Sequence, residues 1–237
     1  MDVAGTRFFA VIVAAGVGER MNCAIPKQYL PILGKPVLAH TLEVFERCAE
    51  IEEVIPVINP FHENLFVTQI WERYRYRKMR RYVFGGERRQ DSVYQGLLML
   101  KEYQDDFVLV HDGVRPLLDQ ETLQRCLGAL KEYEAICCAV PCIDTLKLTE
   151  DGKVIRETLD RRRIWRAQTP QGFRIGILWE ALRLAEQDGF WGTDDASLVE
   201  RLGKPVHIVI GSEDNLKITT PQDLVFAEEW LRWRRES

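Results

Sequence analysis

The sequence lacks any apolar run long enough to cross a membrane. A span needs roughly 18 consecutive apolar residues, and the run at residues 8–15 already ends at Gly16. We therefore expect neither a membrane span nor a signal peptide. Positive charge is not in excess either, because the formal net charge is −4. No global field favours nucleic acid or an anionic membrane as a partner, so any anion site must come from local placement of Lys and Arg.

Cysteine and histidine are sparse and carry no recognisable site pattern. The six cysteines form no Cys-x-x-Cys pair and have no metal-type spacing with the four histidines. They are Cys23, Cys48, Cys126, Cys137, Cys138 and Cys142. We expect reduced thiols in a cytoplasmic protein. No Ser-His-Asp, Cys-His or paired-acid arrangement suggests a nucleophile or a general base.

Short apolar runs alternate with longer amphipathic segments, which predicts an α/β fold. The expected strands are residues 8–14, 54–58, 81–84, 107–111, 135–140 and 206–210. The expected helices are residues 37–48, 64–76, 92–103, 121–133, 176–186, 195–202 and 221–234. Because the strand runs are continuously apolar, we expect helices on both faces of an open, doubly wound, mostly parallel sheet. The absence of linkers predicts one domain, residues 1–237.

This alternation breaks after Val140. Two extended runs, residues 144–148 and 154–158, flank Glu150-Asp151-Gly152. Asp-Gly between two such runs is a hairpin signal, and an isolated hairpin is marginal in water. We therefore predict that residues 142–165 form a protruding arm that packs on another surface.

The first expected strand runs directly into a glycine-containing loop. The segment is Ala14-Ala15-Gly16-Val17-Gly18-Glu19-Arg20-Met21, with Pro26-Lys27-Gln28 after it. Gly16 and Gly18 let the backbone turn tightly and direct N–H groups at an anion, and Arg20 and Lys27 add positive charge there. The loop has neither the third glycine of G-x-G-x-x-G nor the Gly-Lys-Ser/Thr of a P-loop. Because ligands bind beyond the carboxyl ends of strands in open α/β sheets, it predicts a triphosphate cradle.

Two further motifs follow expected strands. In Gly85-Gly86-Glu87-Arg88-Arg89-Gln90-Asp91-Ser92, the two glycines allow close approach to a flat base, although a plain helix start explains the same residues. In His111-Asp112-Gly113-Val114-Arg115-Pro116, Asp112 is a candidate Mg²⁺ ligand and Arg115 a candidate phosphate partner. The alternative for that pair is a structural ion pair, and we expect His111 to be structural.

Two later segments supply more cations. Arg161-Arg162-Arg163 precedes Gln168-Thr169-Pro170-Gln171, and the arginine triplet alone is typical of a solvated loop. Lys217 is flanked by apolar Leu216 and Ile218, so alternation directs it away from their side.

Seven motifs occur in order along about residues 8–224. They are Ala14 to Met21 with Pro26-Lys27-Gln28, Gly85-Gly86, His111-Asp112 with Arg115-Pro116, Asp160-Arg161, Gln168-Thr169-Pro170-Gln171, Thr193-Asp194-Asp195-Ala196-Ser197 and Asn215-Leu216-Lys217-Ile218-Thr219. In this order they resemble the 2-C-methyl-D-erythritol 4-phosphate cytidylyltransferase family of the non-mevalonate isoprenoid pathway. The resemblance implies a Rossmann-like nucleotidyltransferase fold, and a reaction of CTP with the polyol phosphate that gives a cytidyl diphosphate product and pyrophosphate, with Mg²⁺.

The resemblance also implies a role for each matching residue. Arg20 and Lys27 would stabilise the transition state at the α-phosphate. The CTP-binding residues would be Ala14, Ala15, Gly16, Gly18, Gly86 and Ser92, with Asp112 beside the metal. The acceptor would be positioned by Arg115, Arg161, Thr169, Thr193 and Lys217. The arm would clasp a second subunit in a homodimer, so that Arg161, Thr169 and Thr193 serve the neighbour's site.

One pair of residues departs from the family pattern, and two other functions compete. Gly113-Val114 stands where family members commonly carry Ala-Ala, which puts the backbone contacts there in question. Ribitol 5-phosphate cytidylyltransferases resemble the chain motif for motif and are the alternative enzyme. A silent nucleotide-binding or dimerisation module is the alternative of another class, although such a module would have no reason to retain Arg20, Lys27, Asp112 and Lys217 together.

Overall fold

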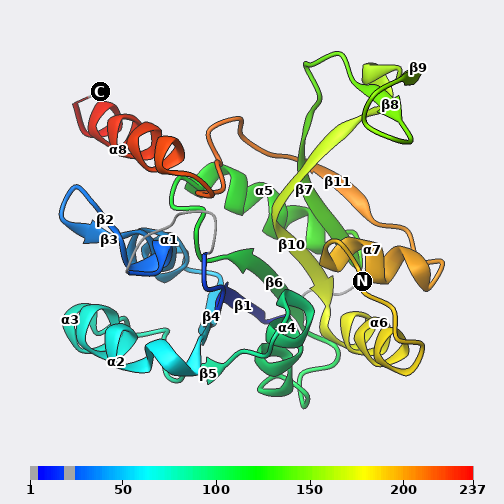
Figure 1. The fold of residues 1–237 in the computed structure, drawn as a ribbon. Helices are drawn as coiled ribbons and strands as arrows, with labels where there is room; N and C mark the ends of the chain where they lie inside the picture. The colour runs from blue at the N-terminus through cyan, green and yellow to red at the C-terminus, as the bar shows by residue number, and fades with distance from the viewer. Residues whose placement is uncertain (1–4, 19–24, 237) are drawn as a thin grey trace.

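A seven-stranded sheet forms the centre of the computed structural model, which describes residues 5–18 and 25–236. The strand order is β11-β7-β10-β6-β1-β4-β5 (Figure 1). The strands are β1 (Phe8–Ala14), β4 (Ile51–Ile58), β5 (Val83–Phe84), β6 (Phe107–Asp112), β7 (Ala135–Pro141), β10 (Trp165–Arg174) and β11 (His207–Ile210). Neighbouring strands are parallel except where β10 pairs with β6 and β7. The predicted mostly parallel sheet is confirmed.

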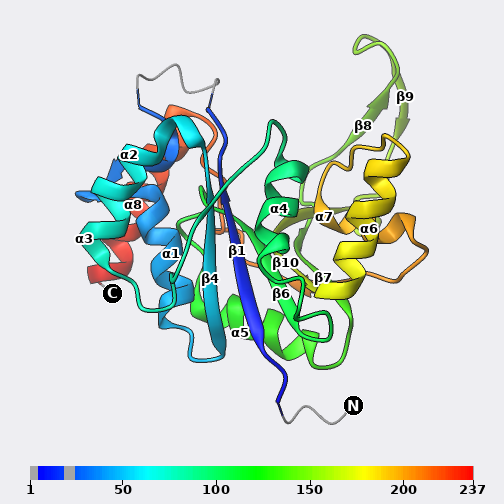
Figure 2. The ribbon, with the colours of Figure 1, turned by 90° about the horizontal axis from the view of Figure 1, so that it is seen from below.

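Helices cover both faces of this sheet because β1 is apolar on both of its own faces. Phe8, Ala10 and Ile12 belong to one core, whereas Phe9 and Val11 belong to the other. The elements on the first face are α1 (Val37–Arg47) and α5 (Gln120–Leu130), and those on the second are α4 (Arg89–Leu98), α6 (Ile175–Gln187) and α7 (Asp195–Arg201). Figure 2 shows α1 on one side of β1 and β4, and α4, α6 and α7 on the other. Burial of both faces is the main apolar contribution to folding.

Smaller elements complete the body. Between β1 and α1 lie η2 (Lys27–Tyr29) and a short ladder of β2 (Pro31–Ile32) with β3 (Lys35–Pro36). The final helix is α8 (Pro221–Glu236), which begins at the predicted residue. No helix in the part of the chain that the structure describes is long and apolar enough to span a bilayer.

The segment expected as one helix at residues 64–76 is instead broken into several turns. It consists of η3 (Pro60–His62), α2 (Glu63–Phe66), the π-helix η4 (Val67–Trp71) and α3 (Glu72–Tyr74). The helical run ends at Arg75, whose φ of 48° lies in the left-handed region. A left-handed residue commonly ends a helix, which accounts for the early stop.

Residues 142–164 leave the sheet between β7 and β10 as the predicted arm. Its strands β8 (Lys147–Thr149) and β9 (Ile155–Thr158) pair antiparallel, and all their side chains are exposed. The connecting turn has Gly152 at φ 74°, and Asp151 Oδ1 accepts hydrogen bonds from the N–H groups of Lys153 and Val154. The arm projects from the body at the upper right of Figure 1. The hairpin predicted from Asp-Gly is confirmed.

The sequence did not predict β10, which runs antiparallel through the middle of the sheet. Its ten residues include Pro170 and Gly172 and no run of β-branched residues, so its composition is not that of a central strand. Its register with β7 shifts between Ala167 and Gln171. That irregularity accommodates Pro170 inside the sheet.

Candidate active site

A cavity of about 460 Å³ lies at the carboxyl ends of β1 and β6. Its walls are residues 13–18, Lys27, Gln28, residues 86–89, Ser92, Asp112, Val114 and Lys217. Four segments that are far apart in the sequence therefore meet in one place. This edge of an open α/β sheet is where ligands bind.

The cavity unites most of the residues that the sequence analysis selected. Those in its wall are Ala14, Ala15, Gly16, Gly18, Lys27, Gly86, Ser92, Asp112 and Lys217. Arg115 lies next to the wall and contacts Asp112 at 3.4 Å. Arg20 lies outside the described residues. Arg161, Thr169 and Thr193 are absent from the wall, and the chemical role of each selected residue stays a prediction.

Glycines bring the phosphate loop against its neighbours. Gly18 has a φ of 74°, which favours glycine, and a Cβ placed there would lie 3.4 Å from Lys27 Cγ. A Cβ on Gly85 would lie 2.5 Å from both Ala15 Cβ and Ser92 Oγ. A separation of 2.5 Å is shorter than any real contact of a Cβ atom. The phosphate loop and the loop that contains Gly85 therefore touch only because Gly85 has no side chain.

Asp112 is the centre of a cluster of cations. Its carboxylate lies 2.9 Å from Lys217 Nζ, 3.1 Å from Arg89 Nε and 3.4 Å from Arg115 Nε. Burial alone would raise the pKa of Asp112, but these three cations hold it well below its usual range. The carboxylate is therefore charged at any physiological pH, and it orients a positive surface of which Lys217 and Arg89 line the cavity.

Two buried side chains, Thr169 and a neutral His111, hold the backbone N–H of Asp112 in place. The Asp112 N–H donates to Thr169 Oγ1 at 3.1 Å, and that hydroxyl lies 2.9 Å from His111 Nδ1. Burial lowers the pKa of His111 to about 3. A neutral His111 accepts the hydroxyl proton at Nδ1, and its Nε2 then faces the carbonyl of Arg115 at 3.4 Å. Thr169 is buried, and its hydroxyl is engaged inside its own chain.

Arg89 is a site residue to which the sequence analysis assigned no role. Its guanidinium contacts Asp112 on one side and Asp195 on the other, the latter at 2.8 Å. It thereby ties the base of the cavity to the start of α7. Each partner lies far from Arg89 in the sequence, so no local pattern could have revealed the pairing.

The surroundings of Asp112 do not fit a resident divalent cation. Magnesium prefers oxygen ligands, whereas both oxygens of Asp112 face cationic side chains. Within residues 5–18 and 25–236, no three His, Cys, Asp or Glu side chains gather as a metal-binding group. The expectation that Asp112 itself holds Mg²⁺ therefore finds no support in this geometry.

Gly113 and Val114, the two residues that depart from the family pattern, keep their backbone contacts. The Gly113 N–H donates to the Val13 carbonyl at 2.8 Å, and the Val114 carbonyl accepts from Ile218 N at 2.9 Å. A Cβ on Gly113 would lie 2.9 Å from Leu38 Cδ1, so the smaller residue suits this packing. Val114 adds an apolar side chain to the cavity wall.

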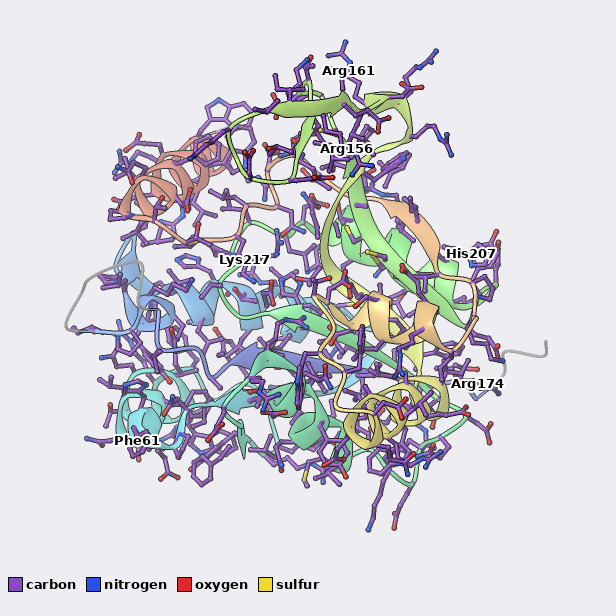
Figure 3. The ribbon with its side chains drawn as sticks, turned by 45° about the vertical axis from the view of Figure 1, so that its right-hand side comes forward. Phe61, Arg156, Arg161, Arg174, His207 and Lys217 are labelled. Atoms are coloured by element: carbon purple, nitrogen blue, oxygen red, sulfur yellow. The ribbon has the colours of Figure 1, made fainter. Side chains whose placement is uncertain are left out.

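Two of the predicted acceptor-positioning residues lie away from this cavity. Arg161 is exposed in the arm and donates to the carbonyl of Ile143 at 2.8 Å. Figure 3 shows Arg161 at the arm, well separated from Lys217 in the body. Thr193 is exposed just before α7, where Asp194 caps the helix by accepting from Ser197 N at 3.0 Å. Neither residue reaches the cavity of its own chain.

Comparisons with known proteins agree along nearly the whole chain. The family model described as IspD, 2-C-methyl-D-erythritol 4-phosphate cytidylyltransferase, matches residues 8–233. A protein of that name from Geobacter metallireducens is 46% identical over 229 residues, which are 94% of this chain and 97% of the relative. Another of that name, from Syntrophus aciditrophicus, is 47% identical over 224 residues, 94% of this chain and 95% of the relative.

Solved structures agree as well. The crystal structure of 4-diphosphocytidyl-2C-methyl-D-erythritol synthase from Anaerococcus prevotii matches with a TM-score of 0.85 and 34% identity, covering 97% of this chain and 98% of that one. The Francisella tularensis 2-C-methyl-D-erythritol 4-phosphate cytidylyltransferase matches with a TM-score of 0.81 and 32% identity, covering 95% and 99%. With its fold, its cavity and its full-length relatives all in agreement, this chain belongs to the 2-C-methyl-D-erythritol 4-phosphate cytidylyltransferase family.

Proposed function

We propose that this protein transfers the cytidylyl group of CTP to 2-C-methyl-D-erythritol 4-phosphate. The products are 4-(cytidine 5′-diphospho)-2-C-methyl-D-erythritol and pyrophosphate, in non-mevalonate isoprenoid precursor biosynthesis. The observation that carries the proposal is the cavity whose wall contains the glycine loop, Lys27 and Lys217. Asp112 holds Lys217 there through an ion pair. The names of the full-length relatives point to the same reaction.

The chemistry needs no general base. The attacking group is a phosphate monoester, whose second pKa is about 6, so it is largely dianionic at pH 7. Catalysis then consists of in-line positioning and of neutralising charge that develops at the α-phosphorus. Lys27 and Arg20 supply that charge in the proposal. Lys217 and Arg115 position the acceptor from the cluster around Asp112, and Arg161 and Thr193 position it from the neighbouring subunit. Thr169 contributes indirectly, because its buried hydroxyl accepts from the backbone N–H of Asp112.

Magnesium enters this proposal as part of the nucleotide substrate. A divalent cation on the triphosphate oxygens would offset the charge of the phosphates, and it needs few protein ligands there. The ion pairs of Asp112 support this assignment, because they leave that carboxylate to orient cations. No step depends on a metal held by the protein.

A homodimer formed through the arm is the proposed assembly. The arm exposes apolar side chains, with Ile143 67%, Val154 70% and Ile155 60% accessible. Such residues gain most from burial against another surface. The separation of Arg161 from the cavity of its own chain supports its assignment to the neighbour's site. A cytoplasmic location is also proposed, and the five described cysteines, all free and buried, support it.

Pyrophosphate release tests the reaction directly. Purified protein with CTP and Mg²⁺ is supplied either with 2-C-methyl-D-erythritol 4-phosphate or with ribitol 5-phosphate. We expect rapid release with the first acceptor and at least tenfold slower turnover with the second. Preference for ribitol 5-phosphate would replace the proposal with its alternative, and release with neither acceptor would leave a silent binding module.

A further inference from the structure

Three successive backbone carbonyls of the phosphate loop are each held by a side-chain amide. Gln28 Nε2 donates to the carbonyl of Ala14 at 2.8 Å and to that of Gly16 at 3.0 Å. Asn59 Nδ2 donates to the carbonyl of Ala15, between them, at 3.0 Å. The hydrogen-bond partners decide which atom of each side-chain amide is nitrogen and which is oxygen. Gln28 Nε2 faces two carbonyl oxygens, and Asn59 Oδ1 accepts from Phe61 N at 2.9 Å.

These contacts fix the direction of the loop's N–H groups. A peptide unit is planar and trans, so the C=O of one residue and the N–H of the next point to opposite sides. Holding the carbonyls of Ala15 and Gly16 therefore holds the N–H groups of Gly16 and Val17 away from the amides. No backbone carbonyl among the described residues accepts from either N–H, and both residues line the cavity. Unpaired N–H groups facing a cavity suit a phosphate.

Without the amides, the same loop could present its carbonyls instead. A carbonyl oxygen carries partial negative charge and would repel a triphosphate. Glycine at position 16 imposes little restriction on the backbone, so the loop's own sequence does not select one direction. The selection comes from two side chains on other elements, Gln28 in η2 and Asn59 after β4.

Gln28 also links the loop to the predicted catalytic lysine. It follows Lys27 directly in η2 and is only 1% exposed. Its two hydrogen bonds therefore anchor the backbone of Lys27 beside Gly18, against which the Lys27 side chain packs. One buried amide thus sets the position of both the backbone donors and a cation.

We propose that Gln28 and Asn59 are positioning residues, which turn the N–H groups of the phosphate loop toward the cavity and so set the affinity for triphosphate and pyrophosphate. The inference rests on the proposed function for its substrate. The affinity of the loop for pyrophosphate can be measured without turnover of the polyol phosphate.

The decisive variant is Gln28→Met, which keeps the length of the side chain and removes the donor. Buried carbonyls left without a donor regain freedom to turn, and we expect the dissociation constants of CTP and pyrophosphate to rise at least about tenfold. The KM for the polyol phosphate should stay within about twofold, since Lys217 and Asp112 do not contact this amide. Calorimetry with pyrophosphate and steady-state kinetics give the two readouts.

A second variant guards against a failure of Gln28→Met to fold. Asn59→Ser keeps an oxygen that can accept from Phe61 N but cannot reach the Ala15 carbonyl. We expect a smaller rise of the same kind, about threefold to tenfold. The control is Gln120→Met, which removes an exposed hydrogen bond from a side-chain amide of α5 to the Val44 carbonyl of α1 and should change neither dissociation constant.

Wild-type pyrophosphate affinity in folded Asn59→Ser, or in folded Gln28→Met, would overturn the inference. An equal rise in the KM of CTP and of the polyol phosphate would also overturn it, because general loosening predicts that pattern. If wild-type protein binds pyrophosphate but turns over no polyol phosphate, the proposed function fails while the loop proposal is still decided by binding.

Discussion

The guanidinium Nη1 of Arg89 lies 2.8 Å from the carboxylate Oδ2 of Asp195, whose side chain is 1% exposed. Burial raises the pKa of Asp195. Burial alone would lower the pKa of Arg89, but Asp195 and Asp112 together raise it above its ordinary value. Arg89 is therefore a permanent cation between two buried acids. Arg89 thereby connects the cation cluster at the cavity to the start of α7.

Replacing that cation should leave two buried carboxylates without their shared partner. We expect Arg89→Met to lower the free energy of unfolding by about 3 kcal/mol or more, as removal of one member of a buried ion pair does. Urea denaturation measures the change. The control is Arg232→Met, which breaks two exposed ion pairs with Glu228 and Glu229 and should cost less than about 0.5 kcal/mol. Equal losses in the two variants would contradict the bridging role.

Stability should fall on mild acidification because His111 stays neutral in the folded chain. Its pKa is lowered by burial to about 3, against about 6.5 in an unfolded chain. Below pH 6.5 the unfolded chain therefore takes up a proton that the folded chain does not, and this loss of stability continues down to about pH 3. Between pH 7 and pH 5, His111 should contribute about 2 kcal/mol of it. Chemical denaturation at both pH values should show a smaller loss in His111→Gln than in wild type, and identical losses would show that His111 does not titrate this way.

Lys27 should matter for turnover far more than for folding. Removing one charge-stabilising donor typically costs about 10²–10³ in kcat, and we expect at least that from Lys27→Ala. Pyrophosphate release measures the rate, and circular dichroism checks the fold. Lys131→Ala, an exposed lysine at the end of α5, serves as the control and should be silent. Near-normal turnover of Lys27→Ala would remove Lys27 from the mechanism.

The contact between the first two motifs should not tolerate a methyl group. In Gly85→Ala the new Cβ would meet Ala15 Cβ and Ser92 Oγ at 2.5 Å. Overpacking of this kind typically costs about 1–3 kcal/mol, and we expect the KM for CTP to rise at least about tenfold as the two loops separate. Gly128→Ala is the matched control, because nothing lies within 4 Å of its Cβ in α5. That variant should gain about 0.5–1 kcal/mol, and similar kinetics in both variants would argue against the close approach.

The proposed exchange of Arg161 between subunits can be tested by mixing inactive variants. After exchange of subunits between Lys27→Ala and Arg161→Ala, half of the dimers are mixed, and each mixed dimer contains one site with both residues intact. We therefore expect recovery of about a quarter of wild-type turnover in a closed two-fold dimer. Mixing Lys27→Ala with Lys217→Ala should recover none, because both residues belong to one cavity. No recovery in the first mixture would contradict the assignment of Arg161 to the active site of the neighbouring subunit.

Local patterns predicted the elements whose signals lie within a few residues. The apolar run of β1 predicted its bounds, and Asp151-Gly152 predicted the turn of the arm. The central strand β10 escaped prediction because its pairing with β6 and β7 overrides an unfavourable composition.

The candidate site divides in the same way. Glycines and cations next to strands indicated the cavity, because the carboxyl ends of parallel strands meet at one edge. Two interactions were not predictable, since each joins distant parts of the chain. They are the ion pair of Arg89 with Asp195 and the hydrogen bond from Asn59 to the Ala15 carbonyl. Nor could the sequence show that the carboxylate of Asp112 is surrounded by cations.

The ladder of β7 and β10 holds the two ends of the arm together where the arm leaves the sheet. Pro141 pairs with Trp165 in the ladder of β7 and β10, and Cys142 N donates to the Ile164 carbonyl at 2.9 Å one step further out. Insertions, deletions or a grafted hairpin beyond this closure would leave the register of the two strands unchanged. Apart from Arg161, the surface that the arm offers can therefore diverge between lineages, or be redesigned, without shifting the strands that carry the cavity.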